Sequence, residues 1–155
     1  MYLHTTQEID TNSISHVDLK YIEFTTDETV GNGRDPVILL HGLLGQKRNF
    51  ASLGTSLALQ LEHKRRIFAV DLRNHGDSTD WRSEMSYSQM AEDIRQFMDN
   101  VGIEKAVLIG HSMGGKCAKA MALTYPDRVS GLIVLDISPV RYTEDTLLGM
   151  QFKIL

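Results

Sequence analysis

Cysteine is almost absent from this chain of 155 residues: Cys117 is the only one, which excludes an internal disulfide framework. Positive charge is not in excess either, because 16 Lys and Arg stand against 20 Asp and Glu, a formal net charge of −4. A mildly acidic chain without a basic stripe argues against nucleic acid as the main partner. No apolar run reaches the length that spans a membrane, and no Cys/His cluster has zinc spacing. We therefore expect no nucleic-acid partner, no membrane span, no metal ion and no cofactor.

The ends of the chain carry little pattern. The first ten residues lack the apolar core of a signal peptide and the Arg-rich, acid-poor composition of a transit peptide. With 42% hydrophobic and 23% charged residues the composition is that of a globular domain. We expect a loose N-terminal leader at residues 1–16, a single domain at 17–142, and a weakly structured tail at 143–155.

Short apolar runs predict the strands. Each is four residues long and rich in Val, Ile and Leu, which is typical of parallel strands buried on both faces: Val37–Leu40, Ile67–Val70, Ala106–Ile109 and Leu132–Leu135. A weaker alternating pattern at 18–25 predicts an early, partly exposed strand.

Helical patterns separate the runs. The first has apolar residues at helical spacing at Phe50, Leu53, Leu57 and Leu61, and the second at Met90, Ile94, Phe97, Met98 and Val101. Ser86 and Gln89 have the spacing of a capping box at the start of the second helix, which stops near Gly102. A third helix is expected from about Gly114 to Tyr125, ended by Pro126. This alternation predicts an α/β fold with a mostly parallel sheet and helices on both faces.

The segment Gly110-His111-Ser112-Met113-Gly114 matches the motif G-x-S-x-G between a predicted strand and a predicted helix. A nucleophilic serine in this motif sits on a sharp, strained turn, so the residues two before and two after it must lack bulk. Gly110 and Gly114 meet that requirement. The turn would expose the Ser112 hydroxyl and place the backbone N–H of Met113 as one oxyanion donor.

A second donor is expected from the loop after the preceding buried strand. Val37–Leu40 leads into the sequence HGLLG at 41–45, and we assign the N–H of Leu43 to this role, with Leu44 as the alternative. Gly42 would shape the turn, and His41 would brace it. The simpler interpretation, that the glycines only form a turn, loses weight because the serine motif follows downstream.

The same residues also fit most of a phosphate-binding loop. Gly110, Gly115 and Lys116 satisfy G-x-x-x-x-G-K. The next position, however, is Cys117, and a thiol is a poor substitute for the hydroxyl that ligates Mg²⁺ in such loops. A serine held in a tight turn also leaves no room for amides to wrap a phosphate. We therefore interpret Lys116 as a solvated helix residue and Cys117 as a small residue facing the core.

A nucleophilic serine needs a base and an orienting acid. The histidines are His4, His16, His41, His63, His75 and His111, and none follows Ser112 in this sequence. We expect His111 to point elsewhere on the turn, His75 to be structural and His63 to be solvated.

Asp136 is the candidate acid. It ends the run Leu132–Leu135, 24 residues after Ser112, so a strand–helix–strand crossover would bring it to the same edge of the sheet. The alternative is a turn or cap residue before Ser138 and Pro139. Asp71 also ends a strand, but its surroundings suggest that it supports a loop.

Four segments together resemble a known family. HGLLG (41–45), DLRNHGDS (71–78), GHSMGGK (110–116) and LDISPV (135–140) are similar to the α/β-hydrolase subfamily of abhydrolase domain-containing protein 11, a pattern shared with bacterial serine esterases and fungal alcohol acyltransferases. The resemblance implies ester or thioester acyl transfer through an acyl-enzyme, with Ser112 as nucleophile and Asp136 as acid. It also implies a mitochondrial location in eukaryotic members, whereas the chain shows no clear targeting segment and a cytoplasmic location stays open.

Family members continue with a cap of helices, further strands and a catalytic histidine. We therefore expect a truncated hydrolase domain that lacks the cap and the last strands, with Leu132–Leu135 as an exposed apolar edge. Two hypotheses stay open: an impaired serine esterase or thioesterase acting on a small-molecule ester, and a non-catalytic remnant or interaction module. An alcohol acyltransferase is a further alternative, and the oligomeric state is unknown.

Overall fold

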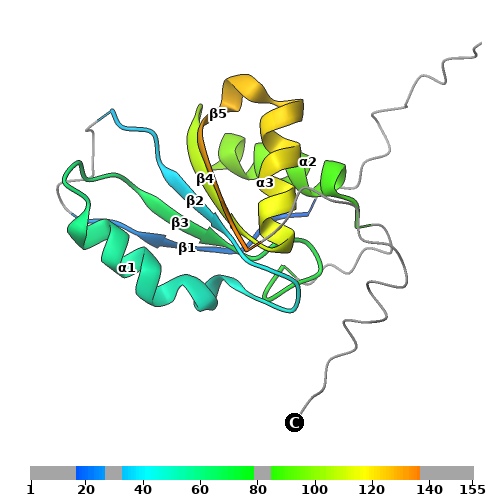
Figure 1. Ribbon diagram of the computed structural model, residues 1–155, viewed down its shortest axis with the longest axis horizontal. Helices are drawn as coiled ribbons and strands as arrows, with labels where there is room; N and C mark the ends of the chain where they lie inside the picture. The colour runs from blue at the N-terminus through cyan, green and yellow to red at the C-terminus, as the bar shows by residue number, and fades with distance from the viewer. Residues whose placement is uncertain (1–16, 27–32, 79–84, 137–155) are drawn as a thin grey trace, which may run out of the picture.

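The computed structural model describes residues 17–26, 33–78 and 85–136 (Figure 1). The leader expected at 1–16, the tail expected at 143–155 and the last residues of the expected domain, 137–142, lie outside the described residues. The domain boundaries therefore stay predictions.

A five-stranded sheet organises the described part of the chain. Its strand order is β1-β3-β2-β4-β5, and every neighbouring pair is parallel except β1 with β3, which is antiparallel. The strands are β1 (Tyr21–Phe24), β2 (Val37–Leu40), β3 (Ile67–Val70), β4 (Ala106–His111) and β5 (Val129–Leu135). The predicted α/β fold with a mostly parallel sheet is confirmed.

Two strands match the predicted apolar runs, and two others, β4 and β5, extend beyond them. The bounds of β2 and β3 are those predicted, and all eight of their residues are buried. β4 continues for two residues to His111, and β5 begins three residues early, at Val129. The strand pairing continues through these added residues, although they do not form an unbroken apolar run with the rest of the strand. A prediction from apolar runs therefore gave strands that are too short.

The helices lie on both faces of the sheet. Figure 1 shows α1 (Ala51–Gln60) on one face and α2 (Tyr87–Asn100) with α3 (Met113–Thr124) on the other, and short 3₁₀ turns occur at η3 (Lys47–Phe50) and η4 (Pro126–Arg128). The predicted capping box is confirmed: the Ser86 hydroxyl accepts from the Gln89 N–H, and the Gln89 side chain accepts from the Ser86 N–H. The third helix ends before Pro126, as expected.

The face that α1 turns to the sheet is in part the one expected: Phe50 is buried, and Leu57 and Leu61 pack against the core, but the predicted Leu53 does not join them. The residues of α1 that are buried are Gly54 and Ala58, whereas Leu53 remains 38% exposed. A Cβ at Gly54 would lie 2.4 Å from the Phe24 ring. At Gly54 the helix thus packs directly on the ring of Phe24 in β1, which leaves no room there for a side chain.

Two apolar cores lie on the two sides of the sheet. The larger one joins β2, β3 and β4 to α2 and α3, with Ile38, Phe68 and Met98 fully buried. The smaller one lies under α1 and includes Leu39 and Ala69. These cores hold the carboxyl ends of the parallel strands in a fixed position, which is where the predicted site residues lie.

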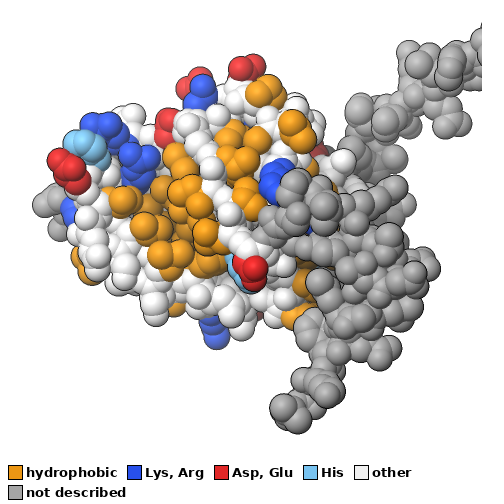
Figure 2. All heavy atoms as spheres, in the orientation of Figure 1, with side chains coloured by type: hydrophobic (Ala, Val, Ile, Leu, Met, Phe, Trp, Pro, Cys, Tyr) orange, Lys and Arg blue, Asp and Glu red, His pale blue; other side chains and the backbone are white. Residues whose placement is uncertain are grey.

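β5 is an outer strand of this sheet. Three of its side chains remain exposed by 40% or more: Leu132, Ile133 and Leu135. Figure 2 shows hydrophobic side chains gathered over the middle of the view, where β4 and β5 lie in Figure 1. The run is therefore not buried on both faces, and the expected exposed apolar edge is present in the described part of the chain.

Candidate active site

Ser112 alone separates the end of β4 from the start of α3. Its backbone has φ +50° and ψ −115°, a left-handed conformation that costs a residue with a side chain on the order of 1–3 kcal/mol. The Ser112 N–H donates to the Leu135 carbonyl (2.9 Å), and the Ser112 carbonyl accepts from the N–H groups of Gly115 (2.9 Å) and Lys116 (3.2 Å). These bonds hold the strained turn from both sides.

Two glycines make this turn sterically possible. A Cβ at Gly110 would lie 2.3 Å from the Gly114 carbonyl oxygen, and a Cβ at Gly114 would lie 2.2 Å from the Leu40 carbonyl oxygen. These contacts are with backbone atoms, which cannot swing aside as a side chain does. The turn therefore has the geometry that the G-x-S-x-G motif requires.

The geometry does not fit the phosphate-binding alternative. A loop that wraps a phosphate needs several residues between strand and helix, and only Ser112 lies there. Lys116 is half-buried with its Nζ 5.9 Å from the centre of the Tyr87 ring, so it is less solvated than expected. Cys117 is fully buried, as expected for a small residue facing the core.

The loop after β2 lies directly beside Ser112. A Cβ at Gly42 would lie 3.3 Å from the Ser112 Cβ and 2.9 Å from Nδ1 of His111. The Gly45 N–H donates to the Gly42 carbonyl (3.0 Å) and closes a turn at whose tip Leu43 and Leu44 lie. Leu44 has φ +60°, and the two leucines are 54% and 75% exposed. Which of their amides is an oxyanion donor stays a prediction.

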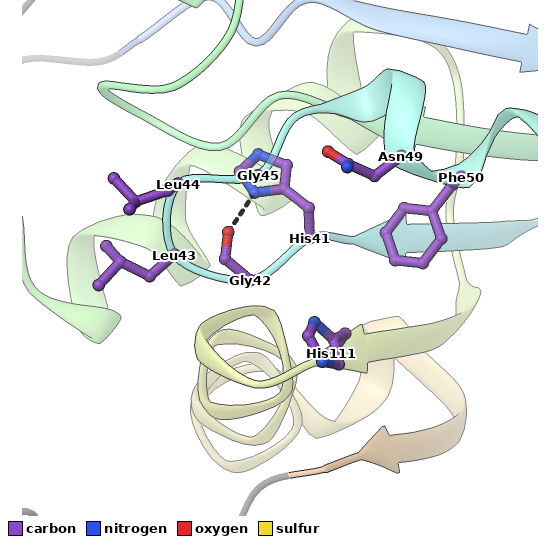
Figure 3. Close-up of a pocket in the computed structure, with 8 residues that line it drawn as sticks. All are labelled: His41, Gly42, Leu43, Leu44, Gly45, Asn49, Phe50 and His111. Carbon is purple, nitrogen blue, oxygen red and sulfur yellow. Dashed lines mark hydrogen bonds between the residues drawn. The ribbon is translucent and has the colours of Figure 1, made fainter. Parts of the chain in front are cut away.

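A cavity of about 380 Å³ opens next to this loop. Figure 3 shows that residues 41–45 form one wall, that His111 lies opposite Gly42, and that the side chains of Leu43 and Leu44 extend together from the tip of the loop. Asn49 and Phe50 complete the lining. The cavity gives the site a partly apolar space.

His41 braces the loop from below. Its Nε2 accepts the Leu72 N–H (3.0 Å), so the proton lies on Nδ1, which donates to the Gly42 carbonyl (2.8 Å). Burial lowers the pKa of His41, and the Gly42 bond opposes this only in part. The ring centre of His75 lies 5.1 Å from that of His41, and its Nδ1–H donates to the Arg73 carbonyl (2.8 Å). His41 is thus a neutral structural group.

His111 and Asp136 approach each other at the carboxyl ends of β4 and β5. His111 Nε2 lies 3.8 Å from Oδ2 of Asp136, and their side chains are 47% and 92% exposed. His111 does not turn away, as its position on the turn suggested, but lines the cavity. Asp136 has φ +51° and follows Leu135, whose carbonyl bonds Ser112. The crossover therefore brings these residues to one edge of the sheet, as expected.

The sequence patterns did not single out Lys47, which is buried and forms ion pairs with the buried Asp71 and with the exposed Asp77. Lys47 Nζ lies 2.5 Å from a carboxylate oxygen of each aspartate, and the Lys47 N–H donates to Asp71 Oδ1 (2.6 Å). Burial by itself would raise the pKa of Asp71, but the hydrogen bonds from Lys47 and from the Asp77 N–H outweigh it and hold this pKa below its usual value. Likewise, burial would lower the pKa of Lys47, but the two carboxylates raise it. Asp71 therefore supports a loop, as expected.

Neither a metal centre nor a membrane span is found where the structure describes the chain. No group of three or more His, Cys, Asp or Glu in residues 17–26, 33–78 and 85–136 could hold a metal ion. No helix within these ranges is long and apolar enough to cross a bilayer.

A strained serine turn between a strand and a helix of a mostly parallel sheet is the arrangement that places the nucleophile in α/β hydrolases. Residues 35–154 match the family model described as alpha/beta hydrolase fold, and the chain belongs to this family. Its relatives include proteins named as an esterase and as a lipase.

Three similar proteins illustrate the relationship. The chain is 39% identical to the sn-1-specific diacylglycerol lipase ABHD11 of Mus musculus over 135 residues, which cover 86% of this chain and 43% of that protein. It is 41% identical to the esterase YbfF of Escherichia coli over 111 residues, covering 72% and 42% respectively. A solved marine microorganism esterase superposes with a TM-score of 0.71 at 34% identity, covering 86% of this chain and 48% of the other. The chain thus spans less than half the length of these relatives.

Proposed function

We propose that the chain carries the nucleophile half of a serine hydrolase active site for carboxylic esters or thioesters. The observation that supports this most directly is the strained backbone of Ser112, which is held beside the loop at Gly42. Strain of this kind persists only where the surrounding structure enforces it, and it is characteristic of functional sites.

The reaction proceeds through an acyl-enzyme. Ser112 Oγ attacks the carbonyl carbon and forms a C–O bond, while its proton passes to a base. The tetrahedral intermediate then expels the alcohol or thiol, which takes up that proton as the C–O or C–S bond breaks. Water then attacks the acyl-enzyme, releases the acid and restores the Ser112 hydroxyl.

The backbone N–H groups of Met113 and Leu43 are the proposed oxyanion donors, with Leu44 as the alternative for the second. Each such donor contributes about 10²–10³ in turnover because it is already in position when charge develops. His41, Gly42, Gly110, His111 and Gly114 have structural roles at this site.

Asp136 is the proposed acid of the triad. Its closeness to His111 supports a place at the reacting edge of the sheet. Since no histidine of this sequence follows Ser112, we propose that the polypeptide of 155 residues turns over slowly on its own. Loss of a triad histidine costs on the order of 10⁶ in turnover.

A small-molecule acyl ester or thioester is the proposed substrate. The names of the relatives, a diacylglycerol lipase and an esterase, support an ester, and the partly apolar cavity supports an acyl group. Transfer of the acyl group to an alcohol instead of water is an alternative, and a mitochondrial or cytoplasmic location stays a prediction.

Covalent labelling with a fluorophosphonate probe tests this proposal. We expect slow labelling of the folded chain that is abolished in Ser112→Ala and unchanged in Ser130→Ala, which alters an exposed serine of β5. Asp136→Asn should slow labelling more than Asp127→Asn, which alters an exposed aspartate outside the site. An acyl thioester offered in aqueous ethanol distinguishes the two acceptors of the acyl group. Transfer to water releases the free acid, whereas transfer to ethanol releases the ethyl ester. A folded protein that never labels at Ser112 would favour the non-catalytic remnant.

A further inference from the structure

The loop at 42–46 is anchored at both ends to the segment that follows β3. At its start, His41 links the Gly42 carbonyl to the Leu72 N–H through its two ring nitrogens. At its end, the Lys47 N–H donates to Asp71 Oδ1 at 2.6 Å. Asp71 and Leu72 are adjacent, so one short stretch of chain holds both ends of the loop.

Between these anchors the loop is strained and has little packing of its own. Leu44 has φ +60°, a conformation that an L-residue with a side chain rarely adopts, and its side chain is 75% exposed. Burial of Leu44 therefore does not stabilise this conformation. The turn bond from Gly45 to Gly42, the bonds between Gln46 and Asn49 and the two anchors hold it.

The carboxylate of Asp71 is itself fixed from several sides. One oxygen accepts the Lys47 N–H, and the other accepts from Lys47 Nζ and from the Asp77 N–H (2.8 Å). A Cβ at Gly76 would lie 2.2 Å from the carboxylate, so the backbone of that residue packs directly against it. Asp71 is completely buried, and this anchor has no room to move.

We infer that Lys47 and Asp71 are positioning residues, which hold the strained loop at 42–46 so that its amides stay beside Ser112. The catalytic part of this inference rests on the proposed function, whereas the anchoring of the loop does not. Both side chains are buried, and the bonds on which the inference rests join Lys47 to the two aspartates and not to Ser112.

A second buried ion pair provides a matched control. Arg73 and Asp93 form two bonds, of 2.6 and 2.8 Å, and both side chains are 1% exposed. This pair joins the segment after β3 to α2 rather than to the loop at 42–46. Arg73→Met and Lys47→Met thus each remove the cation of a buried ion pair, one at a bond to α2 and one at the anchor of the loop.

Two measurements on the full chain test the inference. The first is hydrogen exchange of the backbone amides at 42–46, and the second is the rate of fluorophosphonate labelling of Ser112 at saturating probe. In Lys47→Met we expect exchange at 42–46 to become at least about tenfold faster and labelling to become about 10–100-fold slower. This slowing is smaller than the factor of about 10²–10³ for complete loss of one oxyanion donor, because the donor is displaced and not removed. The probe concentration at half-saturation should change little, since the anchor does not contact the probe.

The control and a milder variant keep the test decisive. Arg73→Met should lower the melting temperature but leave both measurements within about twofold, because the Arg73 guanidinium bonds Asp93 of α2. Asp77→Asn removes one of the two ion pairs of Lys47 but leaves no unpaired buried charge, because the Asp77 side chain is 68% exposed. This variant should shift both measurements in the same direction as Lys47→Met, by a smaller factor.

The outcomes separate the two proposals. Unchanged exchange at 42–46 in Lys47→Met and Asp77→Asn would show that the pair does not anchor the loop. Faster exchange with wild-type labelling would show that the anchor has no role in catalysis. If the wild type never labels but the exchange effect is present, the acyl-transfer proposal fails and the catalytic part of the inference fails with it, while the anchoring stands.

Discussion

Replacement of Gly114 by alanine tests whether the serine turn depends on close backbone contact. The added Cβ would lie 2.2 Å from the Leu40 carbonyl oxygen, 2.5 Å from the Leu40 carbonyl carbon and 2.6 Å from the His41 carbonyl oxygen. Ordinary contact begins near 3.4 Å, so α3 and the end of β2 must separate by about 1 Å. Ser112 is the N-cap of α3 and would move with it.

The expected cost is the difference between two opposing contributions. Overpacking costs about 1–3 kcal/mol and more where the backbone must shift, and three backbone contacts place this site at the upper end. Alanine gains about 1 kcal/mol over glycine in a helix interior. We expect a net loss of about 2 kcal/mol or more, together with slower labelling of Ser112.

Urea unfolding followed by circular dichroism measures this loss, and Gly131→Ala is the control. A Cβ at Gly131 would lie 3.3 Å from the methyl groups of Val107, which can shift by a few tenths of an ångström. We expect this variant to lose no more than about 1 kcal/mol. If Gly114→Ala is as stable as Gly131→Ala and labels at the wild-type rate, the steric account of the turn is wrong.

Three further predictions concern a cap, a thiol and acid stability. Ser86→Ala should cost about 1 kcal/mol in thermal unfolding, because it removes the cap of α2, whereas Ser88→Ala in the exposed first turn should cost nothing; equal costs would argue against the cap. Burial of Cys117 raises the pKa of its thiol, so iodoacetamide should modify it only in unfolding urea, and rapid reaction of the folded chain would contradict this. The lowered pKa of Asp71 contributes stability above its unfolded pKa of about 3.9, which is lost as pH falls through the lower folded value. In Lys47→Met the folded pKa of Asp71 should rise, so the unfolding free energy measured in urea by circular dichroism should change less between neutral and acidic pH than in the wild type, and an equal change would refute the linkage.

Much of the fold followed from local patterns in the sequence. The strands buried on both faces, β2 and β3, had the predicted bounds because every side chain in them must be apolar. The capping box at Ser86 was readable because its two partners are three residues apart. The antiparallel pairing of β1 with β3 was not, since four alternating residues do not indicate which strand they pair with.

Part of the site could also be predicted, because its residues are close together in the sequence. The turn at Ser112 and the glycines around it form a contiguous motif, whose steric requirement can be derived from the residues alone. Lys47 had no local signal: its partner Asp71 lies 24 residues later, and a lysine followed by an arginine suggests solvated surface. The direction of the His111 side chain depends on where β4 ends, and that strand continues two residues beyond the apolar run.

The bond from the Ser112 N–H to the Leu135 carbonyl ties the reactive turn to the last strand that the structure describes. Fraying of β5 from its end would release this amide and let the left-handed serine relax toward an unstrained helix start. Local opening of one outer strand, without global unfolding, would therefore be enough to remove the Ser112 hydroxyl from its reactive position.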